Sequence, residues 1–288
     1  MNAWPIAPMT DAPETLLSLP LGTPGAGRIR YGAAMALYQQ GHISPAELEA
    51  WRIASASDTR PVDQVLAAHG LPAPRRTDPT NALTRLMQEA AAALTSLRCP
   101  GAAELRRLLA QRSETPRPRP AQTLPVVTRH LEKALFALRA THPALATAIT
   151  AASPQLHWQM PDSDSPDPDG PAICTLLGEN APFPARDAEF GLCLIAPHGL
   201  NRDHSHPAPE LYLPLTGPHG WRFGPDRPLI LKPAPVPIWI DAHRPHLIKA
   251  GATPFLALYG RTRDAQAPAR TLPASDWPAL RALRLEAH

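Results

Sequence analysis

The hydrophobic period of the sequence changes at Leu156. Between residues 28 and 154, apolar residues recur at helical spacing, as at Leu83 and Leu86. From Leu156 to about Asp264 the segments are short, alternate apolar and polar residues, and are separated by Pro, Gly, Asp and Asn. Eight or nine short strands at regular spacing are typical of a β-sandwich or barrel. The chain is therefore predicted to be an α+β protein, with helices first and a β-barrel second.

Proline limits the length of every element. The chain has 38 prolines in 288 residues, far above the roughly 5% of average usage. Because proline breaks helix interiors, short elements joined by tight turns are expected. Four regions are predicted: an N-terminal helical extension over 1–75, a helical segment packing on the barrel over 76–154, the β-barrel with the site over 155–270, and a C-terminal helix over 271–288.

The extension contains a clear helix start. Ser44, Pro45 and Glu47 form a capping box with proline at the first helical position. Three short helices in this region could form a helix-turn-helix DNA reader. The sequence lacks a basic recognition face, which favours an extension that packs on the rest of the protein or on a second subunit. Its role is not predicted, and a homodimer is left open.

Charge and cysteine usage exclude several classes of protein. The net charge is +3 with scattered basic residues, so no nucleic-acid partner is expected. The acidic run from Asp162 to Asp169 is predicted to be an exposed loop, and its prolines break calcium-loop geometry. The three cysteines form no CxxC pair, which is typical of a reducing compartment. Without a signal sequence or a membrane-length apolar run, a cytoplasmic location and no membrane partner are expected.

The segment GLNRDHSHPAPELYLPLTG is the strongest functional signal. It places His204 and His206 one residue apart, with Glu210 and Tyr212 shortly after. Because side chains alternate between faces in a strand, the two histidines share one face, as do Glu210 and Tyr212. A bend in between would let all four converge inside a barrel. Two imidazoles and a carboxylate are suitable ligands for a divalent metal ion, and a fourth ligand is required.

Two later histidines are candidates for that ligand. His246 begins an alternating run that continues to TPFLALY, and a strand start can hold a ligand at the barrel rim. His243 lies in the preceding turn and is the second candidate. Ligands of these types suit one divalent transition metal ion, either iron, zinc, manganese, cobalt or nickel.

The same segment resembles the first motif of the cupin superfamily. That motif has a glycine, His-X-His, a glutamate and a second glycine, which correspond here to Gly199, His204, His206, Glu210 and Gly217. The resemblance implies that the barrel is a double-stranded β-helix, or jelly roll.

Within the cupins, HSHPAPELY is similar to the metal segment of the dimethylsulfoniopropionate (DMSP) lyases. The similarity extends over roughly residues 78–264. It implies that the metal ligands are His204, His206, Glu210 and His246, and that Tyr212 is the catalytic base. Two places differ from the family pattern: Asn201 stands where members often have a second tyrosine, and GRTRD follows the last strand.

The resemblance implies a carbon–sulfur lyase that takes DMSP to dimethyl sulfide and acrylate by β-elimination. Removing a proton beside a carboxylate builds negative charge on an anion, and a metal bound to the carboxylate would spread that charge. A cationic sulfonium favours aromatic faces. Trp221, Trp239 and Tyr259 lie on predicted strands and are the predicted substrate-binding residues.

Two other functions use the same ligands. One is a cupin dioxygenase or isomerase acting on another small carboxylate. The other is a non-catalytic cupin that senses a small molecule and signals through its N-terminal helices.

Overall fold

A computed structural model gives the structure of residues 16–17, 26–39, 43–57, 62–70, 79–113, 115–117, 119–161 and 170–285. The chain divides into two compact units, Met1–Asp78 and Pro79–His288. The predicted acidic loop, Asp162 to Asp169, lies outside the described residues, as do most of the first 25 residues and residues 71–78.

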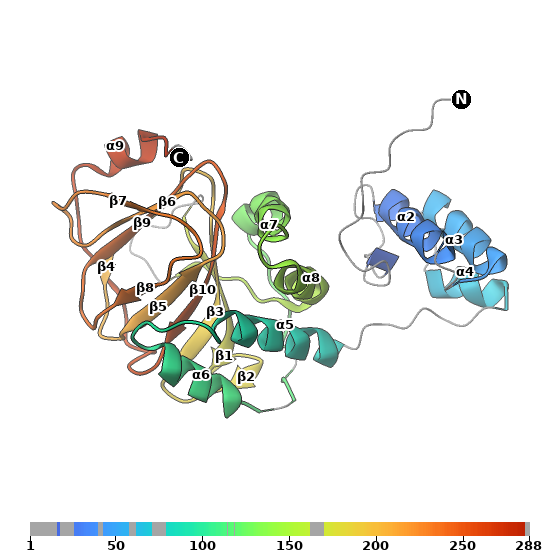
Figure 1. The fold of residues 1–288 in the computed structure, drawn as a ribbon, viewed down its shortest axis with the longest axis horizontal. Coiled ribbons are helices and arrows are strands. Elements are labelled where there is room, and N and C mark those ends of the chain that lie inside the picture. Colours follow the sequence, from blue (N-terminus) through green and yellow to red (C-terminus); the bar gives the residue numbers. More distant parts are fainter. Residues whose placement is uncertain are drawn as a thin grey trace. The chain divides into compact units, whose positions relative to one another are not determined.

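The first unit is helical (Figure 1). It contains α2 (Ala26–Gln39), α3 (Pro45–Ser57) and α4 (Val62–Ala68). Ala34, Ala50, Trp51 and Leu66 form its buried core. The predicted capping box is confirmed, because Glu47 accepts a hydrogen bond from the Ser44 amide at 2.9 Å and the Glu47 amide donates to Ser44 Oγ at 3.2 Å. No helix in the described part of the chain is both long and apolar enough to cross a membrane.

The second unit begins with helices and continues as a barrel (Figure 1). Its helices are α5 (Pro79–Ala93), α6 (Ala102–Ala110), α7 (Pro125–Leu138) and α8 (Pro143–Ala152), with the 3-10 turn η1 (Ser153–Gln155) and a late helix, α9 (Trp277–Ala282). Proline is at the first position of α5, α7 and α8, where its missing N–H costs no helical hydrogen bond.

Two sheets form the barrel. The six-stranded sheet has the order β2 (Phe183–Pro184), β1 (Ala172–Gly178), β3 (Glu189–Ile195), β10 (Phe255–Arg261), β5 (Glu210–Pro214), β8 (Ile238–Ile240). The five-stranded sheet has the order β11 (Arg270–Thr271), β4 (Leu200–Ser205), β9 (His246–Ala250), β6 (His219–Arg222), β7 (Ile230–Lys232). The chain alternates between the sheets from β3 to β6 and again from β7 to β11, as expected for a jelly roll.

The six-stranded sheet is buried on both faces, because its residues alternate between two cores. Leu192 and Leu194 of β3 pack in the large core with the helices α5 to α8. Cys193 and Ile195 of the same strand face the barrel interior with Trp221 and other inner residues. The helical layer therefore holds the sheet from outside, and the inner face is left for the site.

A buried ion-pair network fixes α9 to the five-stranded sheet. Arg222 of β6 donates Nε to Asp203 Oδ1 at 3.1 Å and makes a second contact through Nη2, and it also pairs with Asp276 at the start of α9. Trp277 Nε1 donates to Asp203 Oδ2 at 2.8 Å. Since Asp203 precedes His204 in β4, this network holds the strand that carries the first histidine.

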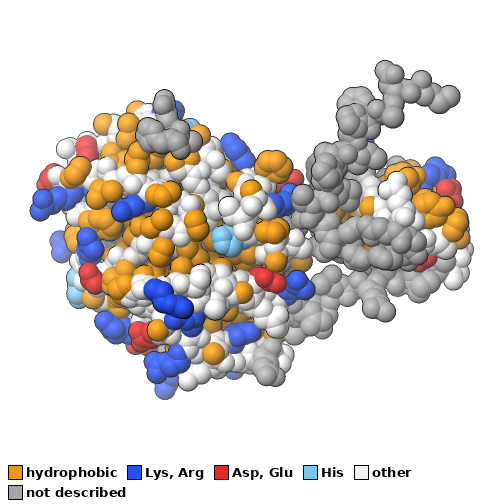
Figure 2. Space-filling view, viewed as in Figure 1, with side chains coloured by type: hydrophobic (Ala, Val, Ile, Leu, Met, Phe, Trp, Pro, Cys, Tyr) orange, Lys and Arg blue, Asp and Glu red, His pale blue; other side chains and the backbone are white. Residues whose placement is uncertain are grey.

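Basic side chains are dispersed on the surface. On the face shown in Figure 2, the Lys and Arg side chains of the described residues are scattered among hydrophobic and polar ones. This distribution is consistent with the scatter of basic residues along the sequence.

Candidate metal centre

Three histidines from two neighbouring strands meet inside the barrel. His204 of β4 and His246 of β9 are direct partners in the strand register, and their ring centroids are 4.0 Å apart. His206 follows β4 directly, with its ring 5.2 Å from that of His246. Each histidine offers one ligand nitrogen, and these nitrogens all lie within 4.8 Å of one another. His246, rather than His243, joins the pair, because the His243 side chain is exposed in the preceding turn.

Backbone carbonyl groups orient the three rings. The Nδ1 atoms of His204 and His206 lie 2.7 Å from the carbonyl oxygens of Arg202 and Ala208, and that of His246 lies 3.1 Å from the carbonyl of Arg244. A carbonyl oxygen only accepts, so each Nδ1 carries the hydrogen and each Nε2 keeps its lone pair. His246 Nε2 has no hydrogen-bond partner among the described residues.

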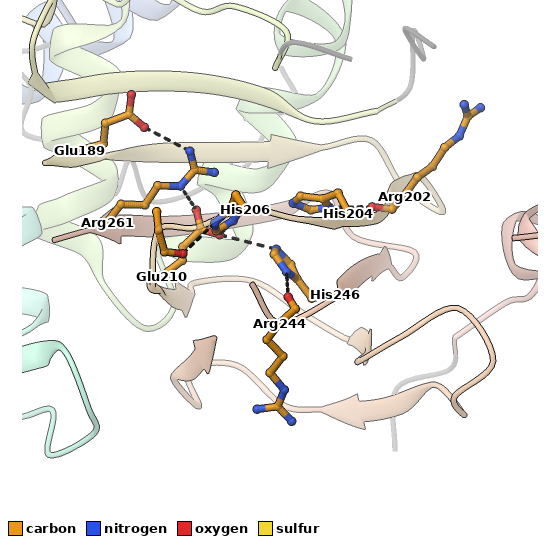
Figure 3. Close-up of polar contacts among 9 residues, drawn as sticks. Glu189, Arg202, His204, His206, Glu210, Arg244, His246 and Arg261 are labelled. Carbon is orange, nitrogen blue, oxygen red and sulfur yellow. Dashed lines mark hydrogen bonds and ion pairs between the residues drawn. The ribbon is translucent and has the colours of Figure 1, made fainter. Parts of the chain in front are cut away.

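Glu210 supplies the carboxylate, which points toward His206 (Figure 3). It is the first residue of β5 and is fully buried. Its Oε2 lies 3.1 Å from His206 Nε2 and 3.6 Å from His246 Nε2. Burial would raise the pKa of Glu210, but Arg261 and the contacts with the histidines lower it well below its usual value. A carboxylate oxygen and imidazole lone pairs face each other here, and a cation between them would satisfy all of these groups.

The pKa values of the neighbouring groups follow from burial. Burial, and then the proximity of His246, lowers the pKa of His204 well below its usual value, so the ring is neutral and able to act as a ligand. Burial first, and the Glu210 carboxylate second, raises the pKa of Tyr212 well above its usual value. A bound dication would act on Tyr212 in the opposite direction.

A cavity of about 280 Å³ opens onto this centre. Its wall includes His204, Glu210 and Tyr212, together with Tyr259, Arg261 and Glu189. The two tyrosine rings lie 6.3 Å apart, and the Tyr259 hydroxyl is 2.9 Å from Thr175 Oγ1. A second cavity, of about 500 Å³, shares Gln159, Thr175, Glu189 and Gln266 with the first. The donor set and the adjacent space suit a metal ion with a small molecule beside it.

The profile of the dimethylsulfoniopropionate lyase family matches residues 100–257, more than half of the chain. The chain belongs to the DMSP lyase family. No curated protein matches the chain.

Solved structures of DMSP lyases share the fold. A chain from the crystal structures of the DMSP lyases RdDddP and RnDddQII is 21% identical with a TM-score of 0.52, and the match covers 68% of this chain and all of that one. DMSP lyase DddQ from Ruegeria pomeroyi is 19% identical with a TM-score of 0.53, covering 66% of this chain and 95% of the other. A cupin-like protein from Thermotoga maritima is 14% identical, with a TM-score of 0.34 and coverage of 40% and 84%. The predicted α+β fold, with a C-terminal cupin jelly roll, is confirmed.

Only some of the aromatic residues predicted for substrate binding in this DMSP lyase family member reach the cavity. Tyr259 lies in its wall, as does Asn201, which replaces the second tyrosine of the family pattern. Trp221 is buried behind Tyr212, with ring centroids 5.2 Å apart, and is not among the wall residues of the described chain.

Trp239 lies on the other face of its strand. Ile238 and Ile240 face the barrel interior, so alternation turns Trp239 outward, where its ring covers Gly101 beside α6. Its indole donates to Asp241 at 2.8 Å. The structure therefore differs from the prediction that Trp239 binds substrate.

Two charged wall residues were not predicted from the sequence. Arg261 is the first arginine of the GRTRD segment, and Glu189 begins β3. Each is an ordinary charged residue at a strand end, and only the strand register brings them together beside Glu210.

Proposed function

We propose that this protein is a metal-dependent lyase that cleaves DMSP, or a close analogue, to dimethyl sulfide and acrylate. One observation carries the proposal: in a member of the DMSP lyase family, three histidines and a buried glutamate meet beside a cavity whose wall contains Tyr212. His204, His206, Glu210 and His246 would hold one divalent transition metal ion. When bound, that ion supplies a Lewis acid for the substrate carboxylate.

Tyr212 is the proposed base because of its position. It lies two residues after Glu210 on the inner face of β5, so its ring enters the same cavity as the ligand set. A carboxylate held at the metal centre would place its α-carbon on the side of Tyr212. The phenolate oxygen can then take the proton from that carbon.

The proposed elimination moves one proton and shifts two electron pairs. Tyr212 takes the α-proton, the electrons of the C–H bond form the carbon–carbon double bond, and the bond from the β-carbon to sulfur breaks. Its electron pair leaves with the sulfur, giving neutral dimethyl sulfide and acrylate. The proton then passes from the tyrosine to solvent.

The aromatic part of the cavity wall suits the sulfonium group. The Tyr259 ring offers an aromatic face, which attracts a cation without forming a tight ion pair. The cavity thus offers candidate metal ligands for the substrate carboxylate and an aromatic ring for the sulfonium.

The test measures metal content and dimethyl sulfide release on one preparation. The wild type should contain about one transition metal ion per chain and release headspace dimethyl sulfide from added DMSP. His204→Ala and His246→Ala should lose both metal and release, whereas Tyr212→Phe should keep metal and lose turnover. His243→Ala changes an exposed histidine nearby and is the matched control.

Other outcomes would identify the alternatives. A metal-loaded protein that consumes oxygen with a small carboxylate, but releases no dimethyl sulfide, would be a dioxygenase. Binding of DMSP without turnover would indicate a sensor. Normal turnover by Tyr212→Phe would remove that residue from the base role.

A further inference from the structure

Three charged side chains form a row across three adjacent strands. Arg261, at the end of β10, is the register partner of Glu189 in β3 and of Glu210 in β5. Directly opposed residues project from the same face of a sheet, so the row lies on the inner face, in the order negative, positive, negative. Opposite charges at opposed positions stabilise this local pairing.

Arg261 engages only one oxygen of Glu210. Its Nε donates to Glu210 Oε1 at 3.0 Å, while Glu210 Oε2 faces His206 and His246 (Figure 3). The Glu210 side chain has no solvent exposure, so water does not compete for these contacts. The two carboxylate oxygens of Glu210 therefore have separate partners: Oε1 contacts the Arg261 cation, and Oε2 faces the histidine nitrogens.

Glu189 forms a longer ion pair with the far end of the guanidinium. Its Oε2 lies 3.6 Å from Arg261 Nη1, and both side chains are about one-fifth exposed. A planar guanidinium contacted on two edges has little freedom to turn. The hydrogen bond to Glu210 and the longer ion pair to Glu189 therefore favour the same orientation of the Arg261 guanidinium, from opposite sides.

We infer that Arg261 is a positioning residue that presents Glu210 to a divalent metal ion through one oxygen only. Holding Oε1 leaves Oε2 as the single carboxylate donor beside the three histidine nitrogens, which keeps the protein ligands at four. This inference rests on the metal centre of the proposed function, but not on the identity of the substrate.

Cobalt(II) binding tests the inference directly, because the absorption spectrum of Co²⁺ reports the number and geometry of its ligands. Affinity is measured on metal-free protein by competition with a chromophoric chelator. Arg261→Gln should weaken Co²⁺ binding about 10- to 100-fold, the range found when a partner of a metal ligand is lost. Its spectrum should shift toward higher coordination as the second oxygen becomes free to bind.

Three further variants separate positioning from a structural role. Arg261→Lys keeps the positive charge but not the planar guanidinium. Its Co²⁺ affinity and spectrum should lie between those of Arg261→Gln and the wild type. Glu189→Gln frees only the far end of the guanidinium and should weaken binding a few-fold, which provides a test should Arg261→Gln not fold. Arg263→Gln removes the same charge from an exposed residue two positions later and should leave affinity and spectrum unchanged.

Wild-type affinity and spectrum in folded Arg261→Gln would overturn the inference while leaving the proposed function standing. Wild-type protein that binds no Co²⁺ would overturn both. Co²⁺ binding without dimethyl sulfide release would overturn only the proposed substrate, and the comparison of Arg261 variants would still decide the positioning role.

Discussion

His219 should make the stability of this protein depend on pH. It is the first residue of β6, fully buried, with its ring 5.4 Å from Phe255 and 6.3 Å from Trp221. Trp221 Nε1 donates to its Nδ1 at 2.9 Å, which requires the lone pair of neutral imidazole. Burial lowers the pKa of His219 from 6.5 to about 4. The folded protein therefore keeps this ring neutral where the unfolded chain would protonate it.

The sign and size of the stability change follow from this difference in pKa between the folded and unfolded states. Between about pH 6.5 and about pH 4 the unfolded chain binds a proton that the folded protein does not, so stability falls as pH falls. At about 1.4 kcal/mol per pH unit the full loss is about 3 kcal/mol. Roughly 2 kcal/mol of it should appear between about pH 7.5 and about pH 5.

Urea unfolding of wild type and His219→Gln at the two pH values measures this loss. A chelator is present throughout, so that metal binding does not contribute. Glutamine can still accept from the Trp221 indole but does not titrate in this range. The wild type should lose roughly 2 kcal/mol more than the variant on acidification. His243→Gln, which alters an exposed histidine, should behave as wild type. If wild type and His219→Gln lost the same unfolding free energy on acidification, His219 would not be the source of the pH dependence.

Three further predictions concern the scaffold and the centre. Asp203→Ala leaves the Arg222 charge buried and should cost about 3 kcal/mol in urea unfolding, whereas Asp203→Asn should cost less. Gly101→Ala should lower the melting temperature by more than Gly70→Ala. Both glycines have φ near +70°, but only at Gly101 would the new Cβ clash with a side chain, the Trp239 ring. Free Co²⁺ or Zn²⁺ at about 100 times its Kd should stabilise metal-free wild type by about 2.7 kcal/mol, and should not change the stability of His246→Ala. Equal melting temperatures of the wild type with and without metal would contradict the proposed metal site.

The cluster of candidate metal ligands could be predicted because most of it is local. His204, His206 and Glu210 lie within seven residues, so strand alternation and one bend suffice to bring them together. His246 was harder, because a second histidine three residues earlier was also available. The structure decides between them through the register, which opposes His246 to His204.

The aromatic wall could not be predicted in the same way. Alternation in VPIWI predicts that Trp239 and its neighbours face opposite sides, but not which side is the barrel interior. The packing of Trp239 over Gly101 turns the tryptophan outward. Trp221 does face inward, yet Tyr212 lies between it and the cavity.

The sequence alone determined the helices, the change to strands at Leu156 and the residues able to hold a metal ion, because periodicity, caps and short spacings are local properties of the chain. Tertiary structure alone decided the row of Glu189, Arg261 and Glu210. Those residues come from three strands, and their meeting depends on the register of a sheet, which is set by packing on both of its faces.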